Sequence, residues 1–303
     1  MGLHLIKIGC CGYPVSMKKY FENFSLVELN TTFYQYPRIS TVEGWRAKAP
    51  ENFEFTVKAH QDISHKFKLK SEKECLEAFE KMKEICNILK AKILLVQTPA
   101  SLRPDRLEDA KEFFSKIPRE DLIVVWETRG PAWDEEETRQ RLAELLEKLD
   151  IPHVVDPFKN TPVYVGKTAY FRLHGLGERL YYYQYSNDEL KRLFNIAREY
   201  ETKAEEVYVL FNNLSMFDDA VRFKHYIEKG KFPSLTKNVG LESIREVLSK
   251  TRYPASKSML LKKVGWKLVE IEKGKQIRLE NFLREIPSKT YNNIDELMKE
   301  IKL

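Results

Sequence analysis

The stretch AYFRLHG, residues 169–175, decides the fold because an apolar run in it ends in charged side chains. Tyr170 and Phe171 belong to the run, and Arg172 and His174 follow at its end. Runs of this length rich in Val, Ile, Phe and Tyr are typical of strands buried on both faces. Seven further runs have the same character: LHLIKIG at 3–9, LVEL at 26–29, FEFTVK at 53–58, KILLVQ at 92–97, LIVVWE at 122–127, HVVD at 153–156 and EVYVLFNN at 206–213.

Amphipathic segments separate most of these runs and predict helices. SEKE at 71–74 and SNDE at 186–189 have the pattern of capping boxes, each opening a helix. Residues 135–149 carry a helical apolar stripe, and a helix over about 218–229 should end at Gly230. Eight strands alternating with helices favour an α/β fold, a (β/α)8 TIM-like barrel. One connection departs from this alternation of strands and helices. Residues 157–168, PFKNTPVYVGKT, have no helical pattern.

The charge distribution predicts two domains. Residues 251–303 hold 12 Lys or Arg against 7 Asp or Glu, whereas residues 1–250 hold 39 against 38. We therefore expect a barrel over 1–250 and a small basic C-terminal α/β module over 251–303. Within the module, the sequence predicts a helix, short strands around Gly274 and a terminal helix.

Composition excludes several classes of protein. No apolar stretch approaches 18 residues, which argues against a membrane span, and the N-terminus does not resemble a secretory signal. Cys10, Cys11, Cys75 and Cys86 form no C-x-x-C pair. We expect a cytoplasmic protein without a cofactor. The oligomeric state is not predicted.

The ends of the apolar runs supply the candidate site. In a parallel barrel the carboxyl ends of the strands converge on one face, which carries the site. A purely structural explanation also stands, since strand ends meet polar loops. The polar residues at these ends are Cys10, Glu28, Asn30, Lys58, Gln97, Glu127, Arg129, Asp156, Arg172, His174, Asn212 and Asn213.

The chemistry of these residues favours an anionic ligand. Lys58, Arg129 and Arg172 would bind phosphate or carboxylate and would repel a divalent metal. Glu127 is the candidate general base or nucleophile, with His174 or Tyr185 as the acid. Glu127 and Arg129 lie side by side along one strand, so we expect them not to pair with each other.

A metal site is an open alternative. His65 and His174 could join Glu127 and Asp156 around an ion, although the sequence has no H-x-x-x-H or H-E-x-x-H pattern. We assign no metal, and His65 is instead placed among the ligand-binding residues.

Seven motifs in order carry a resemblance to a known family. They are IGCCGY at 8–13, VELNTTFY at 27–34, FEFTVKAHQDISH at 53–65, VQTPASL at 96–102, WETRGPAW at 126–133, FRLHG at 171–175 and LFNN at 210–213. Together they resemble the domain of unknown function 72 family, the YecE-like proteins. The resemblance implies a TIM-like barrel with a polar pocket at the strand ends, but no agreed activity. That barrel is similar in shape to endonuclease IV and to sugar-phosphate isomerases, which points to nucleic acid or a phosphorylated sugar. The metal ligands of endonuclease IV are not evident in this sequence.

Three functions are therefore open. The first is binding or processing of a phosphate-bearing ligand, with DNA or RNA favoured and a nuclease-like hydrolase as one form. Lys257, Lys262, Lys263 and Lys267 would contact the phosphate backbone, unless they form a solvated helix face. Tyrosines 181–183 and 185 would stack on bases or sugars, or simply anchor a loop. The second is a metal-independent hydrolase or isomerase of a phosphorylated or carboxylated metabolite. The third is a non-catalytic interaction protein.

Overall fold

The computed structural model describes residues 6–303 and divides into two compact units. The first unit comprises the residues up to 173 together with 195–212. The second comprises residues 174–194 and 213–303.

The first unit is built on seven parallel strands in the order β5-β4-β3-β2-β1-β7-β6. Parallel bridges Trp126↔His153 and Val155↔Phe171 place residues 153–155 between β5 and β6 and close the barrel. The TIM-like barrel is confirmed. The sixth predicted strand, at 153–156, forms only these two bridges. The first predicted strand, at 3–9, is described from residue 6 onward, because residues 3–5 lie outside the described residues. The strands are β1 (Ile6–Cys11), β2 (Leu26–Leu29), β3 (Glu54–Lys58), β4 (Ile93–Gln97), β5 (Ile123–Glu127), β6 (Thr168–Leu173) and β7 (Glu206–Phe211).

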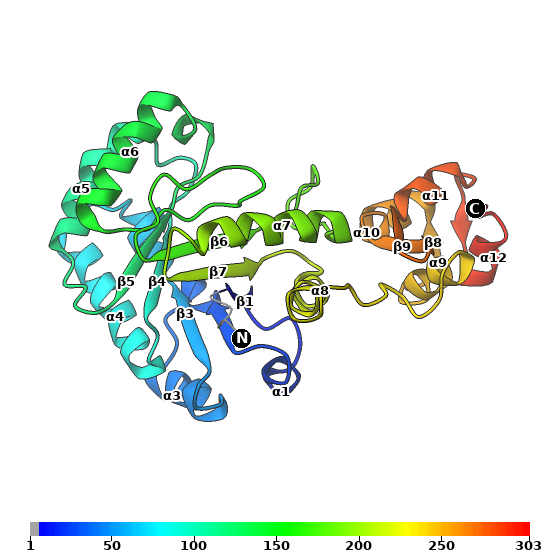
Figure 1. Ribbon diagram of the computed structural model, residues 1–303, viewed down its shortest axis with the longest axis horizontal. Helices are drawn as coiled ribbons and strands as arrows, with labels where there is room; N and C mark the ends of the chain where they lie inside the picture. Colours follow the sequence, from blue (N-terminus) through cyan, green and yellow to red (C-terminus); the bar gives the residue numbers. More distant parts are fainter. Residues whose placement is uncertain (1–5) are drawn as a thin grey trace. The chain divides into compact units, whose positions relative to one another are not determined.

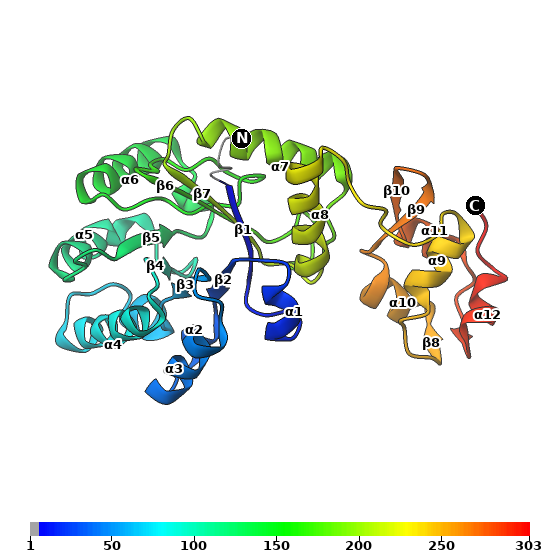
Figure 2. The ribbon, with the colours of Figure 1, turned by 60° about the horizontal axis from the view of Figure 1, so that its bottom comes forward.

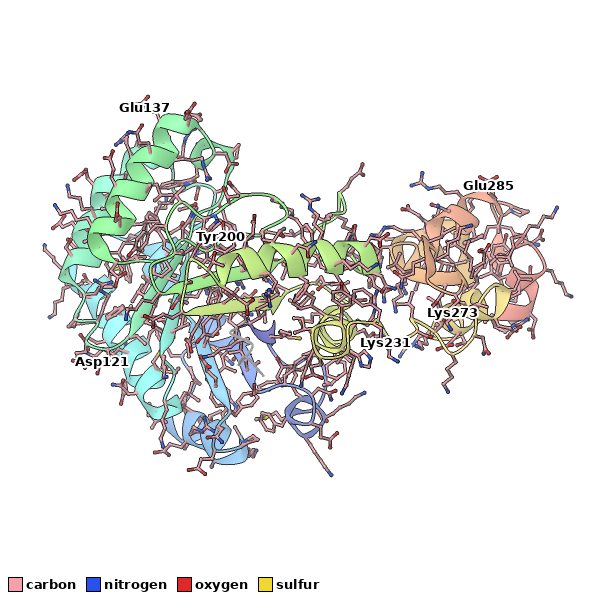
Figure 3. All side chains as sticks on the ribbon, viewed as in Figure 1. Asp121, Glu137, Tyr200, Lys231, Lys273 and Glu285 are labelled. Atoms are coloured by element: carbon pink, nitrogen blue, oxygen red, sulfur yellow. The ribbon has the colours of Figure 1, made fainter. Side chains whose placement is uncertain are left out.

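Helices cover the outside of this barrel. Figures 1 and 2 show α4, α5 and α6 outside strands β3, β4 and β5. Glu137, on α6, is exposed and points to solvent in Figure 3. The helical segments are α1 (Met17–Phe21), α2 (Thr31–Tyr34), α3 (Ile39–Lys48), the π-helix η1 (Asp62–Lys66), α4 (Lys73–Leu89), the 3-10 turns η2 (Pro104–Arg106) and η3 (Pro131–Trp133), α5 (Leu107–Lys116), α6 (Glu136–Leu149) and α7 (Asn187–Tyr200), which spans both units.

The predicted helix signals have mixed outcomes. At the start of α7, Ser186 N donates to Glu189 Oε2 at 2.7 Å and Glu189 N to Ser186 Oγ at 3.2 Å, which confirms the capping box. The predicted box at Ser71 is wrong, because α4 has Glu72 as its N-cap and Ser71 Oγ accepts from Lys116 Nζ at 3.3 Å. The end of α8 (Met216–Lys229) at Gly230, with φ of 68°, is confirmed.

The interior of the barrel changes character from one end to the other. Near the amino ends of the strands, Lys7 Nζ lies 2.6 Å from a carboxylate oxygen of Glu54 and 2.6 Å from one of Glu206. Tyr208 O–H joins the same group and donates to Glu206. An apolar layer follows, made by Leu26, Ile93, Leu95, Val125, Val154, Tyr170 and Leu210. The polar residues at the carboxyl ends are thus held by a rigid apolar layer beneath them.

The second unit has its own hydrophobic core. Ile244 and Leu248 from α9 are buried with Leu260, Val269, Leu283 and Leu297. The antiparallel pair β9–β10 turns at Gly274, which has φ of 81°. The predicted helix, strand pair and terminal helix are confirmed, while the domain division at 250 and 251 stays a prediction. The remaining elements are α9 (Leu241–Leu248), β8 (Ala255–Ser256), α10 (Lys257–Val264), β9 (Leu268–Glu272), β10 (Lys275–Arg278), α11 (Glu280–Glu285), β11 (Thr290–Tyr291) and α12 (Ile294–Met298).

Over residues 6–303, none of the helices has the length and apolar character needed to cross a membrane. The four cysteines are buried, and none of these four described residues is in a disulfide.

Candidate functional site

Arg172 lies at the centre of the polar residues at the strand ends. Its Nη2 donates to Glu28 Oε1 at 2.8 Å and its Nε lies 3.1 Å from both Glu28 oxygens. Its Nη1 donates to Glu127 Oε2 at 2.5 Å. Arg172 is 1% exposed and Glu28 is 0% exposed. The buried guanidinium of Arg172, on β6, therefore bridges β2 and β5. Charge-assisted bidentate bonds of this kind are among the strongest hydrogen bonds in proteins.

Tyr170 supports this ion pair from the same face of β6, since residues two apart on a strand point the same way. Its hydroxyl donates to Glu28 Oε2 at 2.8 Å and lies 2.8 Å from Thr56 Oγ1. Burial would raise the pKa of Glu28, but the charge and hydrogen bonds of Arg172 and the bond from Tyr170 bring it below its ordinary value. Glu28 is thus held as a carboxylate.

Glu127 binds a second guanidinium. Arg129 Nε donates to Glu127 Oε1 at 2.8 Å, and Arg129 Nη2 lies 2.7 Å from the same oxygen. The expectation that these two residues do not pair is wrong, because β5 ends at Glu127 and Arg129 lies beyond the strand with a side chain long enough to fold back. Both oxygens of Glu127 accept from arginine, so its carboxylate lies between two guanidinium groups.

Lys58 is a buried amine at the end of β3. It is 8% exposed, donates from Nζ to Gln97 Oε1 at 2.7 Å, and lies 4.0 Å from the centre of the Phe33 ring. Burial and the nearby Arg172 lower the pKa of Lys58 to about 8, against the effect of Glu127 and Glu28. Within residues 6–303, no carboxylate lies within ion-pair distance of Lys58. Its positive charge is therefore not neutralised by direct contact.

His65 lies close to these cations. Its ring packs edge-on against Phe33 at 5.0 Å, and its Nδ1 lies 2.8 Å from Ser64 Oγ. Burial lowers the pKa of His65, and the charges of Lys58 and Arg129 lower it further. These effects favour the neutral form of the His65 ring.

The structure thus joins most of the expected residues of the first unit. We name Glu28, Lys58, Gln97, Glu127, Arg129 and Arg172 the strand-end cluster. Asn30 lies at its edge, with Oδ1 at 3.5 Å from Arg172 Nη2. Asp156 Oδ1 accepts from Phe158 N at 3.2 Å in a turn, and Asn212 N donates to Leu173 O at 2.8 Å.

Three residues expected at the strand-end site belong to the second unit. Tyr185 is 0% exposed, and its hydroxyl accepts from Gly175 N at 2.8 Å. Asn213 Nδ2 donates to Tyr183 O at 2.8 Å and to Asp219 Oδ2 at 2.7 Å. His174 is buried, with its ring 5.9 Å from that of Tyr181. These bonds give Tyr185 and Asn213 a structural role in the loop, and a catalytic role for His174 or Tyr185 stays a prediction.

The four lysines expected at a nucleic-acid interface have different surroundings. Lys257 Nζ donates to Arg284 O at 2.6 Å and to Ile286 O at 2.8 Å. Lys262 and Lys263 are exposed, whereas Lys267 is half-buried beside Trp266 and burial lowers its pKa. Contact with nucleic acid by these residues stays a prediction.

Sequence reasoning missed the uncharged residues that support the cluster. Tyr170 and Thr56 each precede a cluster residue by two positions, and this spacing could have identified them as inward-facing. Phe33 lies in a short helix after β2 and gave no such signal. In the part of the chain that the structure describes, no three His, Cys, Asp or Glu side chains are arranged to hold a metal.

Comparison with known proteins identifies the family. A family model described as "Protein of unknown function DUF72" matches residues 13–234. The chain belongs to the DUF72 family. It is 23% identical over 242 residues to the UPF0759 protein YunF of Bacillus subtilis, covering 70% of this chain and 85% of YunF. It is 30% identical over 132 residues to the UPF0759 protein YecE of Escherichia coli K12, covering 42% of this chain and 47% of YecE.

Solved structures agree with the fold. A DUF72 family protein from Thermotoga maritima matches with a TM-score of 0.61 and 28% identity, covering 75% of this chain and 100% of the other. A DUF72 family protein from Enterococcus faecalis matches with a TM-score of 0.63 and 23% identity, covering 75% and 98%. SacUVDE matches with a TM-score of 0.50 and 9% identity, covering 75% and 99%, a likeness of fold alone. The DUF72 match ends at residue 234, so α9 and the elements after it lie outside it.

Proposed function

We propose that this DUF72 protein binds an anionic, phosphate-bearing ligand at the strand-end cluster, with nucleic acid as the favoured class. The observation that carries the proposal is Lys58, a buried ammonium whose direct partners are the neutral Gln97 and the face of Phe33. Buried charges are ordinarily paired. An anion reaching Lys58 would supply the missing counter-charge.

The charge balance of the cluster supports this proposal. Lys58, Arg129 and Arg172 are cations, and Glu28 and Glu127 are the carboxylates that the cluster places against them. Arg172 is engaged by both carboxylates, so we assign it to the structure of the site. Lys58 and Arg129 are the cations that would contact the ligand, and the side chain of Arg129 is 26% exposed.

Thermal unfolding tests the proposal with inorganic phosphate, a sugar phosphate and a mononucleotide as probes. At about ten times Kd, the midpoint should rise by about 3–6 °C. Lys58→Met should abolish the rise. Lys73→Met, which removes an amine that is 84% exposed on α4, should leave it unchanged. Equal shifts in wild type and Lys58→Met would exclude the cluster as the site.

A second candidate is a metal-independent hydrolase or isomerase of a phosphorylated or carboxylated metabolite. The pKa of Lys58 at about 8 favours it, because such an amine can exchange a proton near neutral pH. Turnover of a binding metabolite that is lost in Lys58→Met would distinguish it from binding alone. The buried cysteines, which form no disulfide among residues 6–303, favour a reducing compartment, and we propose the cytoplasm.

A further inference from the structure

A pocket of about 540 Å³ lies within the second unit and shares no residue with the strand-end cluster. One wall is the loop at 176–183, and the other is formed by α10, Trp266, the end of β10 and α11. This wall includes residues outside the DUF72 match.

Aromatic rings line the pocket in fixed positions. The Tyr182 and Trp266 rings meet edge to face, with their centres 6.1 Å apart. Trp266 Nε1 donates to Lys263 O at 2.9 Å, which fixes the indole. The Arg179 guanidinium lies 3.2 Å from the centre of the Tyr182 ring. Rings held in this way can stack on a planar ligand with little loss of side-chain entropy.

Positive charge surrounds these rings. Arg179, Lys262, Arg278 and Arg284 line the pocket against the acids Glu178 and Glu280. Arg284 pairs with Glu280 at 2.8 Å, and Arg278 donates to Trp266 O at 2.7 Å. Lys262 is exposed, and Arg179 binds only weakly to Lys262 O at 3.3 Å. Arg179 and Lys262 are therefore the cations best placed to receive an anion.

From this combination we infer that the pocket binds a nucleotide unit. Because the two rings are nearly perpendicular, the base stacks on the face of one and contacts the other edge-on. The phosphate is bound by Arg179 and Lys262. Stacking beside cations is how proteins hold single-stranded nucleic acid without sequence readout. The site does not depend on the strand-end cluster, since all of its residues belong to the second unit.

The test is fluorescence anisotropy of a labelled single-stranded oligothymidylate with the full chain. Lys262→Glu should weaken binding by about tenfold or more, because it removes a phosphate contact and adds repulsion. The matched control is Lys263→Glu, which makes the same charge change one residue along α10 at an exposed position that does not line the pocket. It should stay within about twofold of wild type. Equal losses in the two variants would overturn the inference in favour of diffuse charge attraction, and absent binding would also overturn it.

Two further variants test the stacking. Trp266→Ala and Tyr182→Leu should each weaken binding by about fivefold or more while the circular dichroism spectrum is retained. Because Trp266 is half-buried, Tyr182→Leu preserves the test should Trp266→Ala fail to fold. If either variant folds and binds the oligonucleotide as tightly as wild type, the proposed contact between the base and that ring is wrong.

Competition distinguishes the source of the nucleotide. Displacement of the oligonucleotide by AMP at a similar concentration identifies a single-nucleotide site. Displacement only by an unlabelled strand identifies a single-stranded nucleic acid site, and either result supports the inference. Lys58→Met is measured beside these variants. A loss of oligonucleotide binding in Lys58→Met with full binding in Lys262→Glu would assign the oligonucleotide to the strand-end cluster and overturn the inference.

Discussion

Arg172 and Glu28 form a buried, two-point ion pair between β6 and β2, with Nη2 and Oε1 at 2.8 Å. Arg172 also pairs with Glu127 from β5, so that one guanidinium contacts two carboxylates. Arg129 supplies a second positive charge at Glu127. A buried ion pair adds little to the stability of the folded protein compared with well-packed apolar residues of similar size. Removing one partner of the pair, however, leaves the other charge buried and uncompensated. The strand-end cluster therefore depends on Arg172 for its assembly.

Arg172→Met should reduce the free energy of unfolding by about 3–5 kcal/mol. It leaves Glu28 buried with the Tyr170 hydroxyl but no ion pair, and it leaves Glu127 with Arg129 as its remaining guanidinium. Adding Glu28→Gln should recover part of the loss by removing one buried charge. Urea unfolding of both variants measures the difference. Equal stability of the single and double variants would show that Glu28 is not held by Arg172.

The elements that the sequence predicts well are those set by local pattern. The run at 26–29 is β2 at its predicted bounds, because four consecutive apolar or inward-facing positions specify a buried strand. The run at 153–156 is also a short run with apolar residues, yet it forms only two isolated bridges. Strand pairing depends on neighbouring strands that are distant in sequence, which the local pattern does not specify. The strand-end positions of Lys58, Glu127 and Arg172 follow from the same local patterns.

Partners across the barrel are not predictable in this way. Arg172 and Glu28 are 144 residues apart, and nothing local specifies their contact. The fold-back of Arg129 depends on where β5 ends, which sequence fixes only to within a few residues. The inclusion of residues 174–194 in the second unit likewise depends on tertiary contacts, such as Leu268 N to Gln184 Oε1 at 2.9 Å.

Lys58 should make stability increase with pH in the alkaline range. Its pKa is about 8 in the folded protein and 10.5 ordinarily, so the unfolded chain binds more protons between these values. The free energy of unfolding should therefore rise as pH increases from about 8 to 10.5. Chemical unfolding of wild type and Lys58→Met across this range measures the effect as the difference between the two proteins. A difference that does not vary with pH would contradict the lowered pKa.

Asp219 should produce the opposite trend in the acidic range. Burial raises its pKa from 3.8 to about 7, although Arg222 and Asn213 oppose the shift. The folded state then binds more protons than the unfolded state between these values, and stability falls as pH rises through them. Asp219→Asn removes this titration, so its stability relative to wild type should improve from pH 4 to pH 7. Thermal unfolding of wild type and Asp219→Asn at several pH values measures the difference in their stability. A difference that is the same from pH 4 to pH 7 would argue that Asp219 is ionised throughout this range.

Lys7, at the amino end of the barrel, should contribute stability without affecting ligand binding. Its amine lies 2.6 Å from oxygens of both Glu54 and Glu206, and that end of a TIM-like barrel serves stability. Lys7→Met should cost about 1–3 kcal/mol by leaving two partly buried carboxylates without their shared partner. The matched control is Lys167→Met, whose pair with Glu205 at 2.9 Å is exposed and should cost under about 1 kcal/mol. Urea unfolding compares the two variants, and phosphate-induced stabilisation should persist in both. If Lys7→Met abolishes that stabilisation, the separation between a structural end and a ligand-binding end of this barrel is wrong.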